Sequence, residues 1–110
     1  MTGEGGVIRV LLGWTGEGDF DQEARTFANR LRDSGMDVVF TGVRPRPENL
    51  VRAAIQEDVD VICVIGDGAG LEQVLEMEGA GDMAVVALAK EADCVALVRA
   101  EVRPGSNRSG

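Results

Sequence analysis

The sequence predicts an α/β domain whose mainly parallel sheet is covered by helices on both faces. Short apolar runs of strand length alternate with segments of helical periodicity, and the links between them are short. The length of 110 residues and an apolar content of 45% suit one globular domain. We therefore expect one folded domain over residues 7–103, with flexible Gly-rich ends at 1–6 and 104–110.

The first half of the chain contains two predicted strands and one helix. Val7–Leu12 (VIRVLL) is a mostly apolar run of the length of a strand that is covered on both faces. Apolar residues then recur at helical spacing over Phe20–Leu31, and Asp19 with Gln22 three residues later indicates a capping box at the start of that helix. Asp37–Thr41 is expected to form the second strand.

The middle of the chain repeats this alternation. Pro45 and Pro47 fix the entry to a second helix. Its apolar residues on one face are Leu50, Val51, Ala54 and Ile55. Val59–Ile65 (VDVICVI) is expected to be the third and most buried strand, and Leu71–Glu78 a short third helix.

The last third allows two interpretations. Ala84–Leu88 and Cys94–Val98 both have the composition of strands, but only five residues separate them. A parallel crossover needs about a dozen residues. We favour two strands, the second of which runs antiparallel or pairs poorly; the alternative is that Met83–Val98 is partly helical.

Glycine-rich loops follow the first and third predicted strands, at residues 13–18 and 66–70. Ligands of parallel sheets bind above the carboxyl ends of the strands, where these loops lie. The candidate cofactor-binding residues at this edge are Trp14, Gly16, Gly18, Asp19, Phe20, Gly66, Asp67, Gly68 and Gly70. The only tryptophan, Trp14, either covers the top of the sheet or, with Phe20, offers a surface to a ligand or partner.

The charge of the chain excludes some partners. A net charge of −8 argues against nucleic acid, whose binding requires a cationic footprint. No apolar run is long enough to cross a membrane. Between Ala53 and Val98 there are ten acids and one base, so this part suits either a solvated surface or a basic partner.

Catalytic and metal-binding patterns are missing from the sequence. Cys63 and Cys94 lie in apolar runs without metal-ligand spacing, so they are expected to be buried free thiols in a reducing, cytoplasmic compartment. No histidine is present to activate a nucleophile. We therefore expect no catalytic residues, no metal site and no enzyme activity of the chain on its own.

Three stretches carry a family likeness: Arg9–Leu12 (RVLL), Leu31–Gly42 (LRDSGMDVVFTG) and Pro47–Ile62 (PENLVRAAIQEDVDVI). They resemble segments of the cobalamin-binding domain of methylmalonyl-CoA mutase-type acyl-CoA mutases, over about half of the chain. The resemblance implies a flavodoxin-like, doubly wound sheet of strand order 2-1-3-4-5, truncated here near its last strand.

The residues that hold cobalamin in that family do not carry over. The family's D-x-H-x-x-G motif, whose histidine ligates cobalt, falls on Gly18, Phe20 and Glu23. The S-x-L motif after the third strand falls on Ile65–Asp67, and a Gly-Gly pair that leaves room for the cofactor's nucleotide tail falls on Ala87–Leu88. Because the chain contains no histidine, axial histidine ligation of cobalt is excluded.

These departures lead to three hypotheses. The first is a degenerate relative that takes no cofactor and acts as a non-catalytic interaction or regulatory module, with an acyl-CoA mutase large subunit as the partner. The alternative is a cobalamin-binding small subunit that holds the cofactor base-on, which means that cobalt keeps the cofactor's own nucleotide base as its lower ligand. The third is a small enzyme that uses carboxylates at the strand edge.

Overall fold

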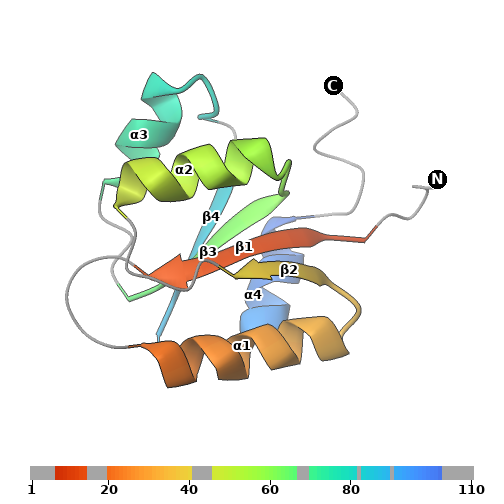
Figure 1. The fold of residues 1–110 in the computed structure, drawn as a ribbon. Coiled ribbons are helices and arrows are strands. Elements are labelled where there is room, and N and C mark those ends of the chain that lie inside the picture. Colours follow the sequence, from red (N-terminus) through yellow and green to blue (C-terminus); the bar gives the residue numbers. More distant parts are fainter. Residues whose placement is uncertain are drawn as a thin grey trace.

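Four parallel strands form the sheet, with helices on both sides (Figure 1). The computed structural model describes residues 7–14, 20–40, 46–66, 70–81, 83–89 and 91–102. Along the chain the elements are β1 (Arg9–Trp14), α1 (Asp21–Asp33), β2 (Asp37–Phe40), α2 (Pro47–Gln56), β3 (Val61–Ile65), α3 (Leu71–Met77), β4 (Ala84–Leu88) and α4 (Cys94–Glu101). The strand order is β2-β1-β3-β4, which confirms the predicted doubly wound α/β class.

The two faces of the sheet have separate cores. Helices α1 and α4 cover one face, where Phe27, Val98 and Leu12 belong to one core. Helices α2 and α3 cover the other face, where Leu50 and Leu75 belong to the core. Because the central strands are buried on both faces, β1 and β3 read as continuous apolar runs in the sequence.

Helix α1 begins differently from the prediction. Phe20 occupies the N-cap and makes no side-chain capping hydrogen bond, so the predicted capping box does not start the helix. Asp19 itself lies outside the described residues. Asp21 and Glu23 in the first turn and Arg30 in the last favour the helix through its dipole.

The predicted strand at Cys94–Val98 is wrong, whereas the strand at Ala84–Leu88 is confirmed. The Asp93 carboxylate caps α4 by accepting a hydrogen bond from the Ala96 N–H at 3.2 Å. Cys94 and Val98, one helical turn apart, are both fully buried. The short link from β4 thus leads into a helix that packs beside α1, and no fifth strand pairs with the sheet in the described ranges.

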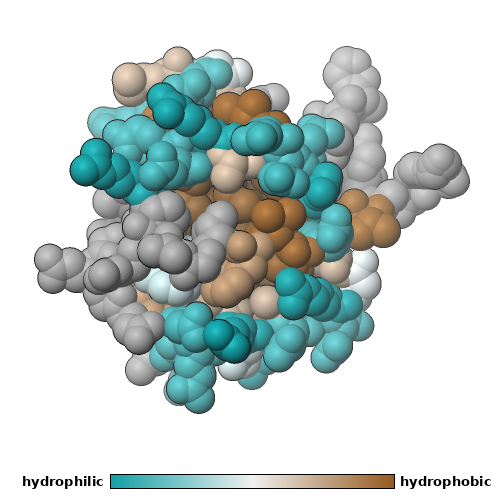
Figure 2. Space-filling view, in the orientation of Figure 1, coloured by the Kyte–Doolittle hydropathy of each residue, from teal (hydrophilic) through white to brown (hydrophobic). Residues whose placement is uncertain are grey.

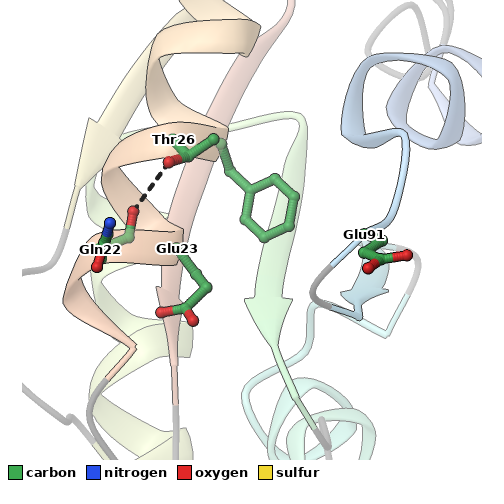
Figure 3. Close-up of a pocket in the computed structure, with 5 residues that line it drawn as sticks. Gln22, Glu23, Thr26 and Glu91 are labelled. Atoms are coloured by element: carbon green, nitrogen blue, oxygen red, sulfur yellow. Dashed lines mark hydrogen bonds between the residues drawn. The ribbon is translucent and has the colours of Figure 1, made fainter.

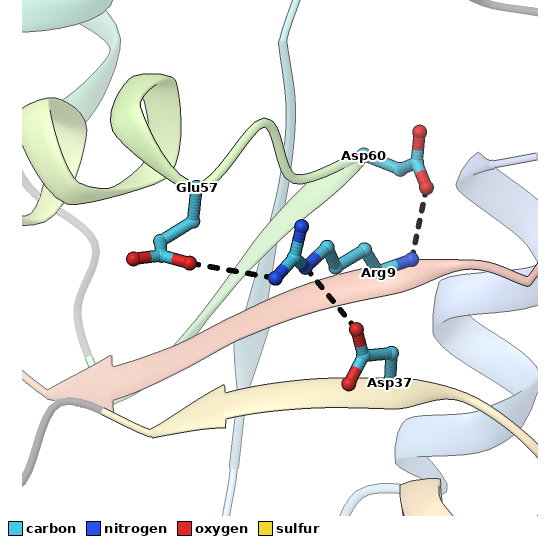
Figure 4. A network of polar contacts seen from close by, with 4 residues as sticks. All are labelled: Arg9, Asp37, Glu57 and Asp60. Atoms are coloured by element: carbon cyan, nitrogen blue, oxygen red, sulfur yellow. Dashed lines mark hydrogen bonds and ion pairs between the residues drawn. The ribbon is translucent and has the colours of Figure 1, made fainter.

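A polar network fixes the amino edge of the sheet, opposite the edge where ligands are expected (Figure 4). The Arg9 backbone N–H donates to the Asp60 carboxylate at 2.9 Å, and Asp60 is buried. The Arg9 guanidinium lies 3.2 Å from the Asp37 carboxylate and 3.4 Å from that of Glu57. Arg9 therefore joins β1 to the start of β2 and to the link between α2 and β3, a structural role.

Candidate functional site

The carboxyl ends of three strands meet in one row of large apolar side chains. Trp14 of β1 pairs in register with Ile65 of β3, which pairs with Leu88 of β4. All three side chains belong to the core under α1 and α4, with exposed fractions of 3%, 1% and 0%. The space between the end of the sheet and α1 is therefore filled by the protein's own side chains.

An aromatic cluster covers the end of β1. The ring of Trp14 lies 6.5 Å from that of Phe20 in a T-shaped contact and 6.2 Å from that of Phe40 in a tilted one. Phe20 precedes α1, and Phe40 ends β2. Within the described part of the chain, the buried indole N–H of Trp14 finds no hydrogen-bond acceptor. Trp14 therefore packs as a cover of the sheet, and its buried indole N–H is a donor without an acceptor among the described residues.

Two of the predicted edge glycines have positive φ angles. Gly66 has a φ of +91° and donates its N–H to the Leu88 carbonyl at 3.0 Å, and Gly70 has a φ of +86° at the N-cap of α3. These backbone conformations favour glycine. The other predicted residues, Gly16, Gly18, Asp19, Asp67 and Gly68, lie outside the described residues. The structure thus brings Trp14 and Phe20 together and places Gly66 on the same edge.

A cavity of about 330 Å³ lies at this edge between α1 and the link from β4 to α4 (Figure 3). Its lining residues are Gln22, Glu23, Thr26, Phe27 and Glu91. The carboxylates of Glu23 and Glu91 come from opposite sides, and Thr26 donates its hydroxyl to the Gln22 carbonyl at 3.1 Å. The cavity can therefore accept hydrogen bonds from a neutral or cationic ligand. Sequence reasoning missed it as a site, because Glu91 reaches α1 only through the fold.

The cysteines are free and buried, as predicted. Burial raises the pKa of Cys63 to about 12, with the nearby Cys94 adding to the effect, and burial also raises the pKa of Cys94. Cys94 is the first residue of α4, although the sequence placed it in a strand. Neither thiol is activated as a nucleophile, because both pKa shifts favour the protonated form.

We expect the stability of the protein to fall as the pH rises above 9. Cys63 ionises near its ordinary pKa of 9.0 in the unfolded chain but only near 12 in the folded one. The stabilisation from the neutral buried thiol is complete below pH 9 and is lost between these values, by about 1.4 kcal/mol per pH unit at most. Urea denaturation at pH 8 and pH 10 should show a smaller pH-dependent loss for Cys63→Ala than for the wild type. Equal losses would contradict this assignment.

Neither a metal-binding cluster nor a membrane-spanning helix is present among the described residues. No three His, Cys, Asp or Glu side chains gather there in a way that suits a metal ion. In the same ranges, no helix combines the length and apolar character needed to cross a membrane.

Comparisons with known proteins identify relatives of the chain. No family model matches the sequence. The chain is 42% identical over 87 residues to the 2-hydroxyisobutanoyl-CoA mutase small subunit of Aquincola tertiaricarbonis, covering 73% of this chain and 64% of that subunit. It is 40% identical over 55 residues to the pivalyl-CoA mutase small subunit of Xanthobacter autotrophicus, covering 50% of this chain and 37% of that subunit. The chain thus spans less than two thirds of either relative.

A solved structure shares the fold. The 1.5 Å crystal structure of a cobalamin-binding protein from Desulfitobacterium hafniense DCB-2 superposes with a TM-score of 0.66 at 17% identity, over 84% of this chain and 49% of that one. This chain and that cobalamin-binding protein therefore share a doubly wound α/β fold. Both sequence relatives are small subunits of acyl-CoA mutases, which confirms the predicted resemblance.

The expectation that the chain takes no cofactor is contradicted by these findings. The relatives are mutase small subunits, and the solved structure of the same fold is a cobalamin-binding protein, which together point to cobalamin. Loss of the family's motif removes one way of ligating cobalt, but it does not by itself exclude the cofactor.

The residues present restrict how cobalamin fits. The chain has no histidine, so no imidazole reaches cobalt. Leu88 stands where the resembling family has a glycine, and with Ile65 and Trp14 it fills the space beneath the edge. These residues do not fit a cofactor whose nucleotide tail is buried there.

Proposed function

We propose that this chain is a small-subunit-type module that binds cobalamin base-on and presents it to the large subunit of an acyl-CoA mutase. The observation that supports this proposal most is the 42% identity to a mutase small subunit over 87 residues. The filled row of Trp14, Ile65 and Leu88 supports the base-on mode, because it leaves no room for the nucleotide tail. That the chain has no catalytic activity of its own stays a prediction.

The edge supplies two kinds of contact for this role. Phe20 and Phe40 are only partly buried beside Trp14, so they offer an apolar surface that the edge of a base-on corrin can contact. The carboxylates of Glu23 and Glu91 can accept hydrogen bonds from the amide groups around the corrin. When bound, the adenosyl form of the cofactor supplies a weak cobalt–carbon bond for radical chemistry. This chain binds and orients the cofactor.

A titration of the purified chain with hydroxocobalamin and adenosylcobalamin tests the proposal. Absorbance should show saturable binding with a dissociation constant on the order of micromolar, and the visible bands should stay those of the base-on cofactor. Fluorescence of Trp14, the only tryptophan, should be quenched at the same stoichiometry. An unsaturated response up to millimolar cofactor would contradict the proposal.

Charge variants locate the binding. Glu91→Lys, at the cavity, should weaken cobalamin binding by about tenfold through loss of a hydrogen-bond acceptor. Glu101→Lys, an equal charge change at the exposed far end of α4, should bind as the wild type does. Equal affinities of the two variants would place the cofactor elsewhere.

A further inference from the structure

The two flanks of α1 differ in charge. Helical spacing places Arg25, Asn29 and Arg32 along the flank that faces β2, whereas Glu23 lies on the flank that faces the β4–α4 link. The chain as a whole carries a net charge of −8, and Ala53–Val98 holds ten acids against one base. The flank beside β2 is therefore a cationic strip on an acidic protein.

A cavity of about 410 Å³ lies between this flank and β2. Its lining residues are Arg25, Ala28, Asn29, Arg32 and Phe40. Ala28 is buried and Phe40 is half-buried, so part of the lining is apolar. Arg25 contacts Asp21 at 2.8 Å while its side chain stays 71% exposed, and Arg32 is exposed without an ion-pair partner in the described residues. The cavity thus combines an apolar part with the guanidinium of Arg32 and with that of Arg25, which is paired with Asp21.

The neighbouring strand β2 is an open edge of the sheet. The Asp37 N–H donates to the Ile8 carbonyl, so with the alternation of a parallel pair the polar backbone groups of Val38 and Phe40 point away from β1. No other described strand pairs with that side. Val39 is half-buried, and Figure 2 shows hydrophobic surface along this edge between α1 and α2. An open, partly apolar edge of this kind suits a protein contact.

We infer that this β2–α1 surface is where the mutase large subunit docks, and that the partner presents an acidic side chain beside an apolar segment. The surface consists of Arg25, Ala28, Asn29, Arg32, Val39 and Phe40. The inference rests on the proposed function, which supplies the partner. An acidic partner is repelled by most of this chain and attracted here, because guanidinium groups bind carboxylates in a bidentate geometry.

The surface is continuous with the candidate cofactor edge. Phe40 lines the cavity and also contacts the ring of Trp14, with 6.2 Å between the ring centres. A partner that docks along β2 therefore reaches the end of β1, beside the edge where the corrin is proposed to lie. Docking here brings the large subunit to the cofactor without covering the Glu23 and Glu91 cavity on the other flank.

The probe is the large subunit of the 2-hydroxyisobutanoyl-CoA mutase of Aquincola tertiaricarbonis, whose small subunit is 42% identical to this chain. Isothermal titration calorimetry should show that it binds the wild-type chain, more weakly as salt is raised. Arg32→Glu should lower the affinity by about tenfold. Arg52→Glu, an equal charge change at an exposed position of α2, is the matched control and should bind as the wild type does.

Three outcomes would overturn the inference. The first is that the wild-type chain does not bind the large subunit, and the second is that the two variants bind it with equal affinities. The third is that the wild-type chain is a dimer in sedimentation velocity and Arg32→Glu dissociates it, because the surface would then bind a second copy of the chain. Cobalamin titration of the same samples separates this inference from the proposed function. Arg32 lies away from the Glu91 cavity, so Arg32→Glu should keep its affinity for cobalamin even where docking is lost.

Discussion

Replacing Leu88 with alanine is expected to lower the free energy of unfolding by about 3 kcal/mol. Leu88 is fully buried at the end of β4, in the core under α1 and α4. Its neighbour in the sheet, Ile65, is held by the backbone ladder, so it cannot move to fill the space that the lost methyl groups leave. Urea denaturation followed by circular dichroism measures the change.

Leu97→Ala is the control for this prediction. Leu97 lies on α4 with 39% of its surface exposed, and its truncation should cost less than about 1 kcal/mol. Similar losses for the two variants would mean that the end of the sheet is loosely packed. Loose packing around Leu88 would then leave space for a nucleotide tail.

Replacing Trp14 with alanine should cost about 4 kcal/mol, the largest loss expected for any single residue of the edge. Trp14 is 97% buried in contact with Phe20 and Phe40, so its removal opens a cavity between β1 and α1. Trp14→Phe should cost less than about 1 kcal/mol. It keeps a ring in place and removes an indole N–H that has no acceptor among the described residues.

The pair of variants tests the packing and the unpaired donor together. In thermal and urea denaturation, the wild type and Trp14→Phe should have similar stabilities, and Trp14→Ala should be the least stable of the three proteins. A loss of several kcal/mol in Trp14→Phe would contradict the account, because it would show that the indole N–H makes a stabilising hydrogen bond.

Much of the fold follows from local patterns. The strands β1, β3 and β4 are apolar runs, and a sheet buried on both faces requires such runs. The prediction failed at α4, because Cys94–Val98 is a continuous apolar run that fits a buried strand or a buried helix equally well. Asp93 in front of that run was the signal for a helix, since its carboxylate caps α4.

The candidate site was less predictable than the fold. The edge positions of Trp14 and Gly66 follow from the rule that ligands bind at the carboxyl ends of parallel strands. Phe40 and Glu91 join the edge only because the topology brings β2 and the β4–α4 link beside β1 and α1. The absence of histidine excludes one ligand of cobalt. The prediction that the chain therefore takes no cofactor was wrong.

A paired titration with cyanocobalamin and dicyanocobinamide tests the central claim most directly. Cobinamide lacks the nucleotide tail that the filled row of Trp14, Ile65 and Leu88 keeps outside the sheet. The account predicts that both compounds bind, with dissociation constants within about tenfold of each other, because the tail adds few contacts. Binding of cobalamin that is tighter by about a thousandfold, or no binding of either compound, would contradict it.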